Sequence, residues 1–288
     1  MSTDILAYFR LGSKLRVPPT TVPATGDRVA GPVVVPRPTV SSVIDRWGPW
    51  MCPMGLLGVA AHDGVPVTLK FWQGHANATL FAGDPRTLTF MVEPLLYSLV
   101  YQQGVHPKFR GAPDAHRYTC GADKVRLGIV TPPGIRWDNR IAKAAINGGI
   151  VLADGEVGRR LLPSLRVLIE QRLREGISYR IARHTVVVLH DVGQYWNRWP
   201  MASRRLWPFI LENGYKVGVH VIVTLRYSDL DRVSRTPSRR IYGAPQAPLP
   251  DAPVLRDLAA MGLETYPPHL ALVPSGGKWL QMVIPSVG

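Results

Sequence analysis

The chain has 288 residues, 46% of them hydrophobic and 19% charged, which is the composition of a globular protein and excludes an intrinsically disordered one. Its 34 lysines and arginines against 20 aspartates and glutamates give a net charge of +14, which favours an anionic partner unless the arginine-rich composition merely reflects a high-GC genome. Two isolated cysteines exclude a zinc knuckle or a disulfide framework, and no apolar run reaches the roughly 18 residues that a membrane span needs.

Proline density divides the sequence into two parts. Residues 1–50 are predicted to form a proline-rich N-terminal arm, and residues 51–288 are predicted to form one domain. Within the arm, residues 17–50 have the composition of an extended strap that lies across a domain.

Hairpin signals lie near both ends of the predicted domain. The apolar runs 55–60 and 65–71 are joined by Ala61-His62-Asp63-Gly64, and an Asp-Gly turn between apolar runs predicts a β-hairpin. Close to the C-terminus, residues 269–273 and 278–284 predict a second, closing hairpin around a Ser-Gly-Gly turn.

Between the hairpins, apolar runs alternate with helical patterns. The runs predict strands at residues 78–82, 124–130, 150–153, 185–189 and 219–224. Helical spacing predicts helices at about 87–103, at 156–175 and between the last two strands. This alternation indicates an α/β fold with a mainly parallel sheet flanked by helices.

Polar residues follow one of these buried runs directly. Thr185–Leu189 is continuous and apolar, as a strand covered on both faces must be, and it stops at His190 and Asp191. A carboxylate would therefore emerge at the carboxyl edge of the sheet, where open α/β sheets bind their ligands.

The order of these elements resembles that of a known family. The segments LKFWQGHANATLFAGDPRTLTFMVEPLLYSLVYQ, KVRLGIVTPPG, ADGEVGRRLLPSLRVLIEQRLREG, VVVLHD and ENGYKVGVHVIVTLRYSDL resemble the FtsK/SpoIIIE–HerA class of P-loop translocases. More narrowly, they look like an ATPase module of the translocase subunit of type VII secretion systems. The resemblance covers roughly residues 45–288 and implies a RecA-like P-loop NTPase fold.

The resemblance also locates a phosphate-binding loop that has lost its defining residues. A working loop reads G-x-x-x-x-G-K-[ST]; its backbone N–H groups and lysine hold the phosphates, and its hydroxyl binds Mg²⁺. Leu88 replaces the second glycine, Thr89 the lysine and Phe90 the hydroxyl. The degenerate loop comprises Gly83, Asp84, Pro85, Arg86, Thr87, Leu88, Thr89 and Phe90.

The other parts of the implied nucleotide site have drifted as well. The family's acidic pair corresponds to His190-Asp191, or to Asp191-Val192 if the register slips by one residue. We expect Asp191 to cap the segment that follows it and His190 to be a hydrogen-bonded core histidine. Thr224 and Arg226 occupy the sensor position, where Arg226 remains a candidate anion contact.

These replacements predict a pseudo-ATPase that uses no cofactor, ATP and Mg²⁺ included. Without the lysine and the hydroxyl, most of the electrostatic stabilisation of phosphoryl transfer is missing. The alternative is that Arg86 takes the place of the lysine. We expect Leu88 and Phe90 to fold inward and fill the space of the nucleotide, and Asp191 to be hydrogen-bonded by protein groups.

Such a module would serve a translocation machine as a structural, docking or regulatory component, with an active ATPase module, a secretion substrate or further copies of itself as partners. One alternative is a DNA-binding component of a conjugative, plasmid or phage DNA-transfer apparatus, and another is an oligomeric structural protein that retains only the fold. We expect a cytoplasmic location, with any membrane association through a partner complex. The candidate contacts to nucleic acid or other anions, which otherwise form a solvated helix face, are Arg159, Arg160, Arg166, Arg172 and Arg174.

Overall fold

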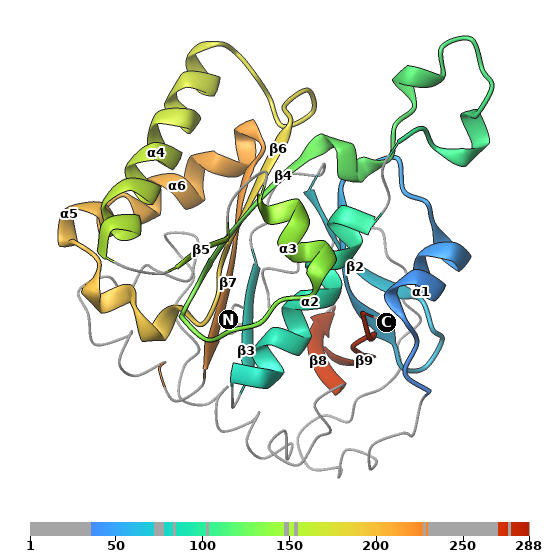
Figure 1. The fold of residues 1–288 in the computed structure, drawn as a ribbon, viewed down its shortest axis with the longest axis horizontal. Helices are drawn as coiled ribbons and strands as arrows, with labels where there is room; N and C mark the ends of the chain where they lie inside the picture. The colour runs from blue at the N-terminus through green and yellow to red at the C-terminus, as the bar shows by residue number, and fades with distance from the viewer. Residues whose placement is uncertain are drawn as a thin grey trace.

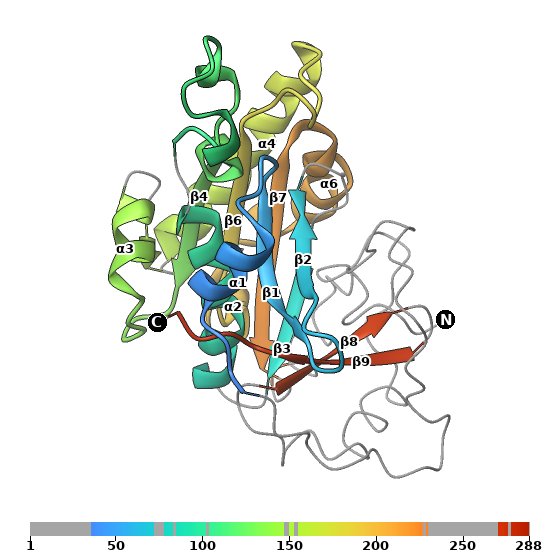
Figure 2. The same ribbon diagram turned by 90° about the vertical axis from the view of Figure 1, so that its right-hand side faces the viewer.

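The computed structural model describes residues 36–71, 78–82, 85–101, 104–146, 150–152, 155–226, 229, 270–275 and 278–287. They form a parallel sheet with the strand order β3-β7-β6-β4-β5 and an antiparallel sheet with the order β2-β1-β9-β8 (Figures 1 and 2). The strands are β1 (Met54–Ala60), β2 (Pro66–Lys70), β3 (Ala78–Ala82), β4 (Val125–Thr131), β5 (Ile150–Leu152), β6 (His184–Leu189), β7 (Val219–Arg226), β8 (Leu270–Ser275) and β9 (Lys278–Val283). The α-helices are α1 (Val40–Trp47), α2 (Pro85–Tyr101), α3 (Asn139–Ile146), α4 (Gly155–Arg174), α5 (Met201–Arg204) and α6 (Trp207–Asn213).

The parallel sheet is covered on both faces, as the apolar runs predicted. On β6, Val186 and Val188 belong to the core beneath α2 and α3, whereas Val187 and Leu189 belong to the core beneath α4 and α6. Successive side chains of a strand point to opposite faces, so a strand with a core on each side must be apolar throughout. Figure 1 shows α4 and α6 on one side of this sheet and α2 and α3 on the other.

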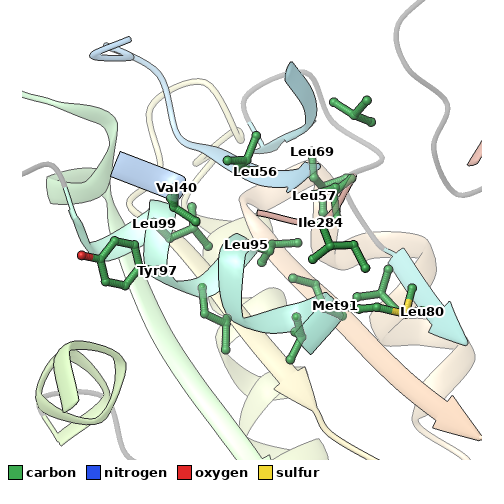
Figure 3. Packing of buried hydrophobic residues seen from close by; sticks show 14 of the residues in the cluster. Val40, Leu56, Leu57, Leu69, Leu80, Met91, Leu95, Tyr97, Leu99 and Ile284 are labelled. Atoms are coloured by element: carbon green, nitrogen blue, oxygen red, sulfur yellow. The ribbon is translucent and has the colours of Figure 1, made fainter. Parts of the chain in front are cut away.

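The antiparallel sheet consists of the two predicted hairpins, which lie side by side. β1 pairs with β2 inside the first hairpin and with β9 of the second, where Val59 lies opposite Val283. Helix α2 packs between the two sheets, with Leu95 and Leu99 in the same core as Leu56 and Ile284 (Figure 3). A Cβ atom at Gly55 would lie 2.8 Å from Leu95, so this close approach of β1 to α2 requires glycine.

The part of the predicted arm that the structure describes is partly helical. Residues Val40–Trp47 form α1 instead of an extended strap, because Thr39 caps the helix in a reciprocal arrangement with Ser42. Val40 and Ile44 are fully buried in the core, so α1 is held by apolar packing. Residues 1–35 lie outside the described part of the chain.

The helix predicted between β6 and β7 is present as the two short helices α5 and α6, and α6 ends at Asn213, at the expected glycine-bounded turn. The 3-10 turns Val192–Gln194 and Trp196–Arg198 precede them. Pro200 stands just before α5 and Pro208 lies in the first turn of α6, and a proline cannot donate the backbone hydrogen bond that would continue a preceding helix. Among the described helices, none is both long enough and apolar enough to cross a membrane.

Candidate nucleotide-site remnant

The carboxyl ends of three neighbouring parallel strands meet at one edge of the sheet, at the bottom of Figure 1. In the pairing of β3 with β7, Ala82 lies opposite Arg226, and in that of β6 with β7, Leu189 lies opposite Val223. His190, which follows β6, therefore lies at the edge where an open α/β sheet binds its ligands. Helix α2 starts from the same edge because it follows β3.

The connection from β3 to α2 is too short for a phosphate-binding loop. β3 ends at Ala82 and α2 begins at Pro85, so residues 83 and 84, which lie outside the described part, are all that separates them. Instead of a loop, residues 85–90 form the first turns of α2, and proline is well suited to a first helical position. The backbone N–H groups of Thr89 and Phe90 are thereby committed to helical hydrogen bonds.

Three side chains from α2, β6 and β7 are joined by hydrogen bonds at this edge. The hydroxyl of Thr89 donates to the carbonyl of Pro85 at 2.9 Å, and it lies 3.2 Å from Nε2 of His190. Nδ1 of His190 lies 2.9 Å from the hydroxyl of Thr224, which accepts the backbone N–H of Asp191 at 2.7 Å. The position expected to hold the phosphate-binding lysine is thus bonded to the strand tip.

One protonation state of His190 satisfies all of these bonds. The hydroxyl of Thr89 already donates to Pro85, so it accepts from an Nε2–H group. Nδ1 then carries no proton and accepts from Thr224. Burial lowers the pKa of His190 to about 4, so the ring is neutral at pH 7, in agreement with this assignment.

Asp191 is held by arginine and does not cap the segment that follows it. Its carboxylate accepts from Nε of Arg226 at 3.0 Å, and the same Nε lies 3.4 Å from Asp229. The residue adopts a left-handed backbone conformation with φ 48°, and its side chain makes no capping hydrogen bond. Burial raises the pKa of Asp191, Arg226 lowers it and Asp229 raises it further. The expected hydrogen bonding by protein groups is confirmed, whereas the expected cap is not formed.

Leu88 and Phe90 do not both fill the site. Leu88 is fully buried, as predicted, but Phe90 is 39% exposed and its ring lies 5.6 Å from the guanidinium of Arg37. The inward position predicted for Phe90 is wrong, because α-helical residues two positions apart in the sequence, such as Leu88 and Phe90, are about 200° apart around the helix axis. Arg86, the candidate substitute for the lysine, is exposed in the first turn of α2.

Trp137 belongs to this site, although its contact with His190 was not predicted from the sequence. Its ring meets that of His190 edge-on, with 4.9 Å between the centroids. The signal that could have identified it is its place in the chain, because Trp137 follows the carboxyl end of β4, which lies beside β6 in the sheet. Its contact shields the imidazole from water and contributes to the burial of His190.

The candidate anion contacts on α4 are largely engaged within the helix. Arg159 and Arg160 pair with Glu156, Arg166 pairs with Glu170, and Arg174 donates to the carbonyl of Glu170. Arg172 differs from the expected solvated or anion-binding side chain, because it is buried and its guanidinium donates to main-chain carbonyls. Those acceptors are Val217 at 2.8 Å and Arg183 at 2.9 Å.

Comparison with known proteins identifies the fold. No family model matches the chain, and no curated protein matches it in sequence. The cytoplasmic domain of EssC matches with a TM-score of 0.54 at 15% identity, over 89% of this chain and 48% of that one. EssC (ATPases 2 and 3) from Geobacillus thermodenitrificans matches with a TM-score of 0.55 at 16% identity, over 89% of this chain and 46% of that one. A protein described as an ATPase matches with a TM-score of 0.54 at 12% identity, over 88% of this chain and 97% of that one.

The chain therefore spans about half the length of the EssC structures. At such low identity the likeness establishes architecture and not activity. The predicted fold class is confirmed: the chain has the α/β architecture of a RecA-like P-loop ATPase domain, and its neighbours include ATPase domains of type VII secretion.

Proposed function

We propose that this chain is a pseudo-ATPase module, a RecA-like P-loop domain that neither binds Mg·ATP tightly nor hydrolyses it. The observation that carries the proposal is the two-residue connection between Ala82 and Pro85. A loop that wraps phosphate needs several consecutive N–H groups free of secondary structure, and here α2 has already begun. The hydrogen bond between Thr89 and His190 adds to this, because the lysine position now contacts the strand tip.

The electrostatics at the strand tip support the same proposal. Phosphoryl transfer needs a cationic group on the phosphates and a carboxylate free to hold Mg²⁺. His190 is neutral, and both of its ring nitrogens are engaged with threonine hydroxyls. The carboxylate of Asp191 is paired with Arg226, so metal binding there would have to break an ion pair.

The proposed role is that of a structural, docking or regulatory component of a translocation machine of the type VII secretion kind. Two independent observations support this placement: the sequence resemblance carried by Gly214–Thr224, and the ATPase modules of EssC among the structural neighbours. A domain that keeps a fold while losing its nucleotide site would act through its surface, and the secretion machinery among its structural neighbours favours protein partners. An active ATPase module, a secretion substrate and further copies of the chain are the candidates.

Calorimetry with ATP and ADP, each with and without Mg²⁺, tests the proposal. We expect no Mg²⁺-dependent heat and no rise in melting temperature. Binding would be easy to detect, because a nucleotide at about 100 times its Kd would stabilise the fold by roughly 2.7 kcal/mol. The variant Leu88→Gly/Thr89→Lys/Phe90→Ser should also fail to hydrolyse ATP, since His190 and Arg226 stay in place. The matched control is Thr89→Ser, which changes the same position but keeps the hydroxyl that contacts His190, and it should behave like the unaltered chain. Micromolar, Mg²⁺-dependent binding by the unaltered chain would overturn the proposal.

The alternative of a DNA-transfer component remains a prediction with its own test. If the arginines of α4 contact DNA, the logarithm of the binding constant should fall with the logarithm of salt concentration, by about 0.9 per phosphate contacted. Replacing Arg159 and Arg166 by glutamine should then reduce that slope by about 2. A binding constant that does not change with salt concentration would argue against DNA binding and favour a protein partner.

A further inference from the structure

The amino end of the parallel sheet, opposite to the nucleotide-site remnant, carries clustered positive charge. β4, β6 and β7 start side by side there, with Val125 opposite His184 and Thr185 opposite Val219. Figures 1 and 2 both show the loop 175–183 and the entries to these strands at this end. The basic residues at this end are Lys124, Arg126, Arg174, Arg180, Arg183 and Lys216.

The loop between α4 and β6 is fixed by its own hydrogen bonds. The N–H of Ile177 donates to Arg172 and that of Ala182 to Ser178, both at 2.9 Å. The N–H of Tyr179 donates to the carbonyl of Lys216 at 2.8 Å, which ties the loop to the 3-10 turn Gly214–Val217 before β7. The buried guanidinium of Arg172 bridges the same two segments. The loop therefore presents a fixed surface.

The charges on this surface are not balanced by neighbouring carboxylates within the described part of the chain. Arg126, Arg180 and Arg183 are exposed, and none of them forms an ion pair with a described residue. Glu175 is the carboxylate within the loop, and it accepts a hydrogen bond from Gln171. The positive potential also acts on buried groups: after burial, the charges of Arg172 and Lys124 further lower the pKa of His184.

Apolar side chains are exposed among these arginines. Ile181 is 74% exposed and Leu173 is 43% exposed, whereas Ala182 beside Ile181 is buried. Single exposed apolar residues are common, but here the isoleucine stands between Arg180 and Arg183 in a loop held by hydrogen bonds. An apolar centre with a charged rim is the anatomy of a protein interface. Phosphate groups would use the arginines and leave the isoleucine without a partner.

We propose that this surface, formed by residues 173–183 and the starts of β4 and β7, docks an acidic segment of a partner protein. An apolar residue of that segment covers Ile181 and Leu173, and its carboxylates pair with Arg126, Arg180 and Arg183. Arginine suits this task because its planar guanidinium binds a carboxylate through two parallel hydrogen bonds. The surface lies at the opposite edge from His190, so the inference does not depend on the state of the nucleotide site.

A labelled helical peptide with glutamates on one face and leucines on the other is the probe, and fluorescence anisotropy follows its binding to the full chain. We expect saturable binding that weakens about tenfold or more in Arg180→Glu/Arg183→Glu, because like charges then face each other. Ile181→Ser should weaken it by a similar factor, through loss of the apolar anchor. The control Arg159→Glu/Arg160→Glu makes the same charge change elsewhere on the surface and should bind like the unaltered chain.

Four results would each overturn the proposal. They are the absence of saturable binding, an equal loss in the control variant, equally tight binding of a polyglutamate peptide without leucines, and preferential binding of a DNA oligonucleotide that is lost in the same variants. The last result would assign the surface to nucleic acid. All of the substituted side chains are exposed, so Arg180→Glu/Arg183→Glu and Ile181→Ser should unfold at the same temperature as the unaltered chain, which separates a binding defect from a folding defect. The control variant loses its pairs with Glu156 and should be only slightly less stable.

Discussion

In the first of the two registers that the resemblance allows, His190 stands where an aspartate is expected, and this exchange would change what the strand tip can hold. An aspartate there would be a ligand for Mg²⁺, whereas a neutral imidazole with both nitrogens engaged offers neither charge nor a free lone pair. The neighbouring Thr89 completes the change, because a short hydroxyl can reach His190 from within α2. Thr89, His190 and Thr224 thus form an internal hydrogen-bond chain at the strand tip.

The chain of bonds predicts a specific loss of stability in Thr89→Val. Valine has the shape of threonine but cannot accept from Nε2–H, so the buried imidazole keeps a donor without an acceptor. We expect the free energy of unfolding to fall by about 1–3 kcal/mol. Urea denaturation measures it, with Thr89→Ser as the control that retains the hydroxyl. Equal stability of the valine and serine variants would show that this bond contributes little.

The ion pair at Asp191 predicts a larger effect. Arg226→Met leaves a buried carboxylate without its partner, which should cost about 3 kcal/mol at pH 7 and raise the pKa of Asp191 further. Adding Asp191→Asn removes that charge and should restore part of the loss, although Asp229 still lacks Arg226. Equilibrium unfolding of both variants decides the matter; a double variant less stable than Arg226→Met would contradict the account.

At this scale the sequence predicted positions better than contacts. His190 and Asp191 were placed correctly at the carboxyl edge, because the first polar residue after a continuous apolar run marks the end of a buried strand. The partners Thr89 and Trp137 come from α2 and from the connection after β4, and no local pattern records which side chains tertiary folding brings together.

At the scale of elements, α2 shows how a motif match can mislead. Matching residues 83–90 to a phosphate loop led us to place both Leu88 and Phe90 in the nucleotide space, although the predicted helix already began at about residue 87. Helical periodicity, applied from Pro85 onward, separates them: Leu88, Val92 and Leu95 share the buried face, and Phe90 lies outside it. The strands were easier to predict, since β4, β6 and β7 begin and end within a residue or two of the expected positions.

The pairing of β6 with β7 predicts a pH-dependent stability. Nδ1 of His184 lies 2.9 Å from Nε2 of His220 in the interior. Burial and the nearby cations Arg172 and Lys124 lower the pKa of His184 to about 4, and burial lowers that of His220 well below its usual value. Both rings are therefore neutral in the folded chain near pH 5, where an unfolded histidine, with a pKa of about 6.5, is protonated.

The unfolded state thus binds more protons than the folded state between about pH 4 and 6.5. Stability should be fully present above that window and fall as the pH drops through it, by up to about 3 kcal/mol for His184. His184→Asn removes this share, so its unfolding free energy should depend less steeply on pH than that of the unaltered chain. Urea denaturation at several pH values makes the comparison, and parallel pH curves would contradict the assignment.

At the scale of the whole molecule, each hairpin was predicted from its own turn, but their union in one sheet was not. The pairing of Val59 with Val283 joins strands from opposite ends of the domain. Such contacts are set by tertiary packing around α2 and leave no periodic signal in either segment. The same limit applies to α1, whose burial follows from its fit against α2 and the C-terminal segment.

The segments 37–40 and 284–286 are joined by hydrogen bonds beside α2. The backbone carbonyl of Ser286 accepts the N–H of Val40 at 2.8 Å, and the backbone N–H of Ser286 donates to the carbonyl of Pro38 at 2.9 Å. Nε of Arg37 donates to the carbonyl of Ile284 at 2.9 Å, and the guanidinium lies over the ring of Phe90. The exposed face of α2 is therefore tied to segments that are far apart in the sequence.

This junction carries the last prediction. Arg37→Met should lower the free energy of unfolding by about 1 kcal/mol, through loss of the bond to Ile284 and of the cation–π contact. Combined with Phe90→Ala, it should show a coupling energy of about 0.5–1 kcal/mol, because the two side chains stabilise each other. Arg46→Met, which removes a cation–π contact with the exposed Trp47, is the matched control and should cost no more than about 0.5 kcal/mol. If the losses of Arg37→Met and Phe90→Ala simply add, Arg37 holds the C-terminal segment alone, and α2 is tied to residues 37–40 and 284–286 by apolar packing without this contact.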